Sequence, residues 1–68
     1  MYVANIVGTL RKERQLTQVE LAEAVGVSRQ TVIAIEKGNY TPSVTLALKI
    51  AAFFQTPVES IFTLHDAT

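Results

Sequence analysis

The sequence feature that most constrains the fold is a helix stop and a helix start separated by one residue. A capping box occupies residues 17–20, where the Thr17 hydroxyl and the Glu20 carboxylate can each accept a hydrogen bond from the other residue's N–H. Gly26 suits the left-handed position that ends a helix, because it has no Cβ. Ser28 is then a good N-cap for a second helix, which Gly38 closes. The sequence therefore predicts two helices joined by a very short turn, over about residues 17–37.

Helices are also predicted on both sides of this pair. Apolar residues at positions 3, 6, 7 and 10 have the spacing of an amphipathic helix from about residue 4 to 14, although Gly8 costs this helix about 1 kcal/mol relative to Ala. A further helix is predicted over about residues 43–54. A second capping box at residues 56–59, with Pro at its N1 position, predicts a short helix that ends near residue 62. Five helices make an all-α fold.

The segments next to the two termini contain β-compatible residues. Tyr2 and Val3 at one end, and Thr63, Leu64 and His65 at the other, can pair as a two-stranded ribbon. Such a ribbon is marginally stable by itself. We therefore expect it only as an addition to the helical domain.

Length and composition exclude several classes of protein. The 68 residues fit a single domain, residues 1–68, that buries only about 60% of its unfolded surface. The chain has no Cys and one His, His65, so we expect neither disulfides nor a metal, and no cofactor. It has no nucleophilic triad, carboxylate pair or Gly-rich phosphate loop, so we do not expect an enzyme. We also expect no signal peptide, no membrane partner, no small-molecule ligand and a cytoplasmic location.

The apolar content is high for a soluble chain of this size. Hydrophobic residues make up 49% of the sequence, and the mean hydropathy is +0.27. We expect some of this surface to meet a second subunit, and the segment 43–68 to complete both the core and a dimer interface. The candidates, not yet divided between core and interface, are Leu46, Phe53, Phe54, Val58, Ile61, Phe62 and Leu64.

The helix pair also meets the packing requirements of a helix-turn-helix. Ala22 lets two crossing helices approach closely, Gly26 makes the turn, and apolar residues at 21, 25, 27, 32 and 35 hold the helices together. Over residues 17–43 (TQVELAEAVGVSRQTVIAIEKGNYTPS) and 46–54 (LALKIAAFF) the chain resembles the Cro/CI, or XRE-type, family of phage and bacterial DNA-binding repressors. The resemblance implies a five-helix, lambda-repressor-like fold that binds double-stranded DNA and, in short relatives with terminal strands, dimerises through the C-terminal end.

The resemblance also implies which residues contact DNA. The helix after Ser28 would lie in the major groove, with base-reading roles for Arg29, Gln30, Thr31 and Ile33. The chemistry agrees, because an Arg fork bonds guanine and a Gln amide bonds adenine bidentately. An exposed Ile33 either contacts a thymine methyl or packs on the next loop. Phosphate-positioning roles are implied for Gln18, Ser28, Lys37, Asn39, Tyr40 and Thr41, the last standing where other members have Asn before the Pro.

One implied contact is structural. Arg11 stands where the family has an Arg that pairs with the Glu at the position of Glu36, and Glu36 lies one turn beyond Val32, at the border of the buried face. The alternative is two separate solvated charges. Lys12 and Arg14 are interpreted as the solvated end of the first helix rather than a phosphate-binding patch.

These observations lead to a homodimeric transcriptional regulator, and more specifically a repressor, because the chain has no room for an activating or ligand-sensing domain. Its two DNA-reading helices would lie about 34 Å apart on a pseudo-palindromic operator. The alternative is a DNA-binding antitoxin or a protein-bridging adaptor with the same fold. Six basic and six acidic residues give zero net charge, whereas a basic surface is the usual footprint of nucleic-acid binding. We therefore expect a DNA face that is only locally positive, through Arg29, Lys37 and the helix N-termini.

Overall fold

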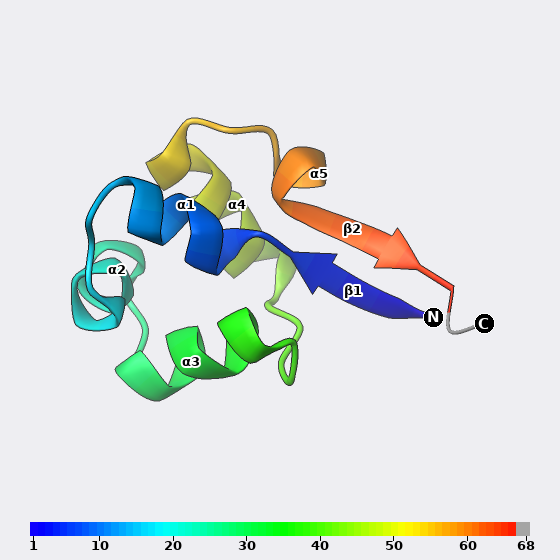
Figure 1. Cartoon of the computed structure of the whole chain (residues 1–68), viewed down its shortest axis with the longest axis horizontal. Coiled ribbons are helices and arrows are strands. Elements are labelled where there is room, and N and C mark those ends of the chain that lie inside the picture. The colour runs from blue at the N-terminus through cyan, green and yellow to red at the C-terminus, as the bar shows by residue number, and fades with distance from the viewer. Residues whose placement is uncertain (67–68) are drawn as a thin grey trace.

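The computed structural model describes residues 1–66 as five helices and two short strands (Figure 1). In chain order they are β1 (Tyr2–Asn5), α1 (Val7–Glu13), α2 (Gln18–Val25), α3 (Arg29–Lys37), α4 (Val44–Phe54), α5 (Val58–Ile61) and β2 (Phe62–His65). This is the predicted helical fold with a terminal ribbon. Residues 67 and 68, which the predicted segment 43–68 included, lie outside the described residues. None of the helices within residues 1–66 has the length and apolar character needed to cross a membrane.

The predicted helix pair is confirmed, and its capping signals form the bonds expected of them. Thr17 Oγ1 accepts from the Glu20 N–H at 3.0 Å, and Glu20 Oε1 accepts from the Thr17 N–H at 2.8 Å, so the capping box opens α2. Gly26 ends α2 in the left-handed conformation, with φ at 78°. Ser28 then caps α3 by accepting from the Thr31 N–H at 3.2 Å. Only residues 26–28 separate the two helices.

The first helix begins later than predicted. α1 starts at Val7 rather than at residue 4, because residues 2–5 pair antiparallel with β2, from Tyr2 opposite His65 to Asn5 opposite Phe62. Asn5 Oδ1 accepts from the Val7 N–H at 3.0 Å and so satisfies one of the free donors at the helix start. The apolar spacing at positions 3, 6, 7 and 10 therefore spans a strand and a helix.

The capping box predicted at residues 56–59 is wrong. Thr56 Oγ1 donates to the Phe54 carbonyl at 3.0 Å, and Pro57 is the N-cap of α5, which has no side-chain cap. The cause lies in the preceding turn, where Gln55 ends α4 in the left-handed conformation and directs Thr56 back to the end of α4. α5 ends at Ile61, because Phe62 already belongs to β2.

The core lies where the helices meet. α2 packs on α3 and α4, α1 packs on α3, and α4 packs on α5. Every helix contributes to it, and burial of a large aliphatic or aromatic side chain stabilises the fold by about 1.5–3 kcal/mol. The buried apolar residues are Val7, Leu21, Ala22, Val25, Val32, Ile35, Leu46, Ile50, Ala51, Phe54 and Ile61.

Candidate nucleic-acid interface

The N-terminal half of α3 presents a polar face away from the core. Val32 and Ile35 are buried, whereas Arg29 and Gln30 are exposed. Ile33 is half-buried, so part of its side chain stays accessible. α3 itself lies along one edge of the molecule, where no other element covers its outer side in the view of Figure 1. This geometry allows the exposed side of α3 to enter the major groove of DNA, with Arg29 and Gln30 facing the bases.

The residues predicted to flank this helix fall into two groups. The first group is exposed at the C-terminal end of α3 and just after it, and consists of Lys37, Asn39, Tyr40 and Thr41. Those at the helix N-termini already have partners within the chain. The Ser28 and Thr31 hydroxyls lie 3.1 Å apart, and the Gln18 amide nitrogen donates to Glu36 Oε1 at 3.2 Å.

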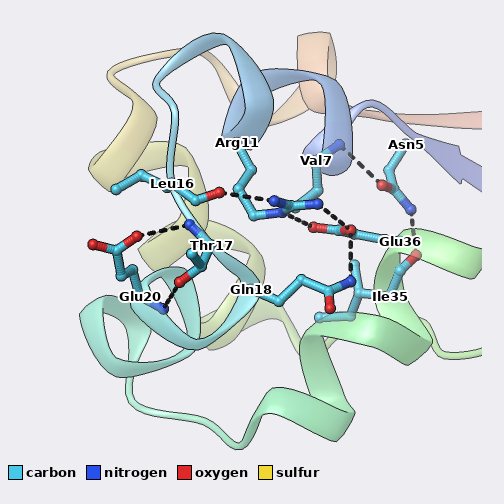
Figure 2. A network of polar contacts seen from close by, with 9 residues as sticks. All are labelled: Asn5, Val7, Arg11, Leu16, Thr17, Gln18, Glu20, Ile35 and Glu36. Carbon is cyan, nitrogen blue, oxygen red and sulfur yellow. Dashed lines mark hydrogen bonds and ion pairs between the residues drawn. The ribbon is translucent and has the colours of Figure 1, made fainter.

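The centre of the polar network is an ion pair between α1 and α3 (Figure 2). Arg11 Nε donates to Glu36 Oε2 at 2.7 Å, and Arg11 Nη2 donates to Glu36 Oε1 at 3.1 Å, which is the bidentate arrangement that binds carboxylates most strongly. Arg11 Nη1 also donates to the Leu16 carbonyl at 2.7 Å. Each of the two charged side chains keeps only 12% of its surface exposed. The pair therefore fixes α3 to α1 and to the loop before α2.

Gly8 lies on the side of α1 that faces this ion pair. A Cβ built on Gly8 would lie 3.4 Å from the Glu36 carboxyl carbon and from Oε1. These distances correspond to the short end of ordinary van der Waals contact, so the glycine that weakens α1 as a helix lies directly against the carboxylate on α3. The sequence shows the cost of Gly8 in helix propensity, but only the structure shows what Gly8 faces.

The network shifts the ionisation of its members. Burial alone would raise the pKa of Glu36, but hydrogen bonds from Arg11 and Gln18 and the nearby charges of Arg11 and Lys12 outweigh it, so the pKa lies below its ordinary value. The hydrogen bond to Glu36 raises the pKa of Arg11 above its ordinary range. Hydrogen bonds with Thr17 in the capping box lower the pKa of Glu20. All three groups are charged at neutral pH.

These shifts predict a pH dependence of stability. Because the native pKa of Glu36 lies below its ordinary value of 4.5, the unfolded chain binds more protons than the native chain between those two values. The stabilisation is complete above about pH 5 and is lost as the pH falls through 4.5 and below the native pKa. Urea denaturation at pH 3–7 should therefore show the midpoint falling below pH 5. Glu36→Gln should flatten this decline of the midpoint with falling pH, whereas Glu20→Gln should remove only the part of the decline that comes from the capping box. An unchanged pH dependence of the midpoint in Glu36→Gln would contradict the assignment of the decline to Glu36.

Two further polar contacts are not indicated by any pattern in the sequence. Asn5 Nδ2 donates to the Ile35 carbonyl at 2.9 Å, which connects β1 to the last turn of α3 (Figure 2). Arg14, expected to be solvated, donates to the carbonyls of Phe53 and Phe54 at 3.1 and 2.9 Å, and its guanidinium lies 5.7 and 5.2 Å from their ring centres. Arg14 thus caps the C-terminus of α4. Residues so far apart in sequence leave no periodic signal.

The structure divides the apolar candidates between core and surface. Leu46, Phe54 and Ile61 are at most 8% exposed and belong to the core of the subunit. Phe53, Val58 and Phe62 are half-buried against that core, and Leu64 is 66% exposed on β2. α4 also exposes Val44 and Leu48, which were not among the candidates.

The exposed cations are few near α3. Arg11 is paired with Glu36, and Arg14 is bonded to the end of α4. Arg29 and Lys37 are exposed at the two ends of α3. The positive charge of this edge therefore comes from these two side chains and from the N-terminal dipoles of α2 and α3.

The capped helix pair, its turn and its exposed edge define a helix-turn-helix protein. The sequence model of the family described as Helix-turn-helix matches residues 7–61 of this chain. The chain belongs to this family and is of the XRE, or Cro/CI, type.

Its relatives are named as regulators of transcription. The chain is 57% identical over 56 residues to an uncharacterised HTH-type transcriptional regulator of Methanocaldococcus jannaschii, covering 82% of this chain and 85% of the relative. It is 50% identical over 62 residues to the uncharacterised regulator YgzD of Bacillus subtilis, covering 91% and 94%. It is also 38% identical over 61 residues to the immunity repressor of Bacillus phage phi105, covering 90% of this chain but 42% of the repressor.

Solved structures show the same fold. A candidate DNA-binding protein from Bacteroides fragilis superposes with a TM-score of 0.79 at 23% identity, covering 90% of this chain and 98% of that one. The chain is therefore a helix-turn-helix protein of transcriptional regulation, and its family implies double-stranded DNA as the partner. The relatives are regulators and not enzymes.

Proposed function

We propose that the protein is a homodimeric repressor in which each subunit reads one half of a pseudo-palindromic operator with α3 as its recognition helix. The observation that carries this proposal is the pair of exposed side chains, Arg29 and Gln30, in the first turn of a helix whose other face is buried. An Arg fork on guanine and a Gln amide on adenine are each worth about 1–3 kcal/mol of discrimination. Thr31 and Ile33, both half-buried, are proposed to extend this contact.

Phosphate contacts would set the position of the recognition helix. Lys37, Asn39, Tyr40 and Thr41 are exposed around the C-terminal end of α3, where they can contact the DNA backbone. Ser28 at the N-terminus of α3 and Gln18 at the N-terminus of α2 are bonded within the chain, so we propose that they contribute through the N–H groups of their helix N-termini.

Apolar surface near the C-terminus supports the dimer. Leu64 is exposed on β2, while Phe53, Val58 and Phe62 keep part of their surface accessible. The ribbon of β1 and β2 also has two outer edges, and unpaired strand edges are ready to pair with another chain. We assign this end of the molecule, rather than the core residues Leu46, Phe54 and Ile61, to the interface.

Selection of binding sites from random duplex DNA, combined with sedimentation of the free protein, tests the proposal. We expect a dimer at micromolar concentration and a selected sequence with two half-sites about 34 Å apart along the duplex. A stable monomer would contradict the homodimer. A dimer that selects no sequence would contradict operator reading and favour the protein-bridging adaptor.

The scarcity of exposed cations predicts a shallow dependence of DNA affinity on salt. Each phosphate neutralised contributes about −0.9 to the slope of log affinity against log salt. With Arg29 counted beside Lys37 as a phosphate contact, two cations per subunit set the steepest expected slope at about −4 for a dimer. Lys37→Ala should reduce the slope by about 1.8 per dimer without changing the selected sequence. Binding titrations between 50 and 300 mM salt measure the slope, with Lys49→Ala on α4 as the charge-matched control. A slope far steeper than −4 would show that other cations contact the DNA.

A further inference from the structure

Asn5 occupies the point where the ribbon, α1 and α3 meet. It is the last residue of β1 and lies opposite Phe62 in the ribbon. Its Oδ1 accepts from the Val7 N–H at 3.0 Å, and its Nδ2 donates to the Ile35 carbonyl at 2.9 Å (Figure 2). Because both ends of the amide are bonded, the side chain is held in one orientation relative to α1 and α3.

The connection from β1 to α3 depends on this side chain. Within residues 1–66, the bond from Asn5 to the Ile35 carbonyl is the one hydrogen bond that joins the two elements. Beyond it, the ribbon and the end of α3 border an open hollow of about 320 Å³, lined by residues 2–5 and 36–38. Side-chain packing therefore does not fill the space between most of β1 and the end of α3.

We propose that Asn5 is a positioning residue that fixes the angle between the ribbon and the recognition helix, and through it the spacing of half-sites that the dimer accepts. This inference rests on the proposed homodimer, whose interface includes the ribbon end of the molecule. If the two subunits join at that end, a change in the angle between ribbon and α3 moves the two recognition helices relative to each other. Half-site spacing is a direct consequence of this geometry.

Two variants separate this role from simple helix capping. Asn5→Asp keeps an acceptor for the Val7 N–H, at a helix N-terminus that favours negative charge, but removes the donor to the Ile35 carbonyl. Asn5→Ala removes both bonds. Ser43→Ala is the matched control, because it removes a side-chain cap from α4, the 3.1 Å bond to the Leu46 N–H, away from both β1 and α3.

The first measurement needs no DNA. Because the chain has no Cys, Gln30→Cys places a single spin label on the exposed face of α3 in each subunit. Electron–electron distance measurements on the free dimer then report the separation of the recognition helices. We expect one narrow distance distribution in the parent and in Ser43→Ala, and a clearly broader one in Asn5→Asp and Asn5→Ala.

The second measurement uses the sequence that the parent selects, with the space between half-sites lengthened or shortened by one or two base pairs. Both Asn5 variants lose the bond to the Ile35 carbonyl. This loss should reduce the preference for the native spacing about fivefold, with affinity for an isolated half-site unchanged. If Asn5→Asp keeps the spacing preference and the distance distribution of the parent, the inference is overturned. An equal loss of affinity for half-sites and for full sites would overturn it as well. A parent that selects no pair of half-sites would overturn the proposed function and, with it, this inference.

Discussion

Replacement of Arg11 by alanine is expected to lower the free energy of unfolding by about 2–3 kcal/mol, a large share of the stability of a domain of this size. Among residues 1–66, the variant leaves the Glu36 carboxylate, 12% exposed in the parent, with only the Gln18 amide as a side-chain hydrogen-bond partner. It also frees the Leu16 carbonyl, so the loop before α2 loses its side-chain bond to α1 and keeps backbone bonds such as that from the Leu16 N–H to the Arg11 carbonyl at 3.1 Å. Breaking one partner of a buried pair costs more than the pair itself contributes, because the other charge stays desolvated.

Thermal and urea unfolding measure this effect, and DNA titration measures its consequence. We expect Arg11→Ala to lower DNA affinity and stability to a comparable extent, since Glu36 lies on the recognition helix. Arg11→Lys keeps the charge but lacks the fork, so it should recover only part of the loss. Lys49→Ala, an exposed cation on α4 that is not among the charges acting on Glu36, is the control that removes an equal charge. Unchanged melting in Arg11→Ala would show that the pair does not hold the fold together.

The second large effect is expected at the DNA face. Arg29→Ala and Gln30→Ala should each lose about 1–3 kcal/mol per half-site in specific binding, so a dimer loses about 2–6 kcal/mol. Weak binding that does not depend on sequence should persist, because the phosphate contacts stay in place. Site selection from random DNA with each variant should show loss of preference at the base pairs that the missing side chain contacts.

The controls for this pair of variants follow from burial. Arg29 and Gln30 are exposed, and substitution of exposed residues usually changes stability by less than about 0.5 kcal/mol. Melting temperatures close to that of the parent would therefore assign the loss to DNA contact rather than to unfolding. Lys49→Ala removes a cation from the exposed side of α4 and should keep the parent's site. If both variants select the same site as the parent, the base-reading assignment is wrong.

Local signals determined most of the helices. The capping box at Thr17, the left-handed Gly26 and the Ser28 cap act over three or four residues, so the sequence contains all the atoms that form these bonds. The same kind of signal failed at Thr56, because the preceding turn at Gln55 determines the direction in which that hydroxyl points. The apolar period of the first helix predicts a start that is too early, because this period continues back into a strand whose partner lies some sixty residues later.

By itself, the sequence determined the helix pair, the polar edge of α3 and the family, because each depends on neighbours along the chain. The tertiary structure alone decided which apolar residues form the core, which side chain Gly8 faces, and which groups Asn5 and Arg14 bind. These contacts join elements that are far apart in the sequence. Their geometry is therefore fixed only when the helices pack against each other. The very short turn between α2 and α3 orients α3, while the contacts of α1 and β1 hold that helix in place.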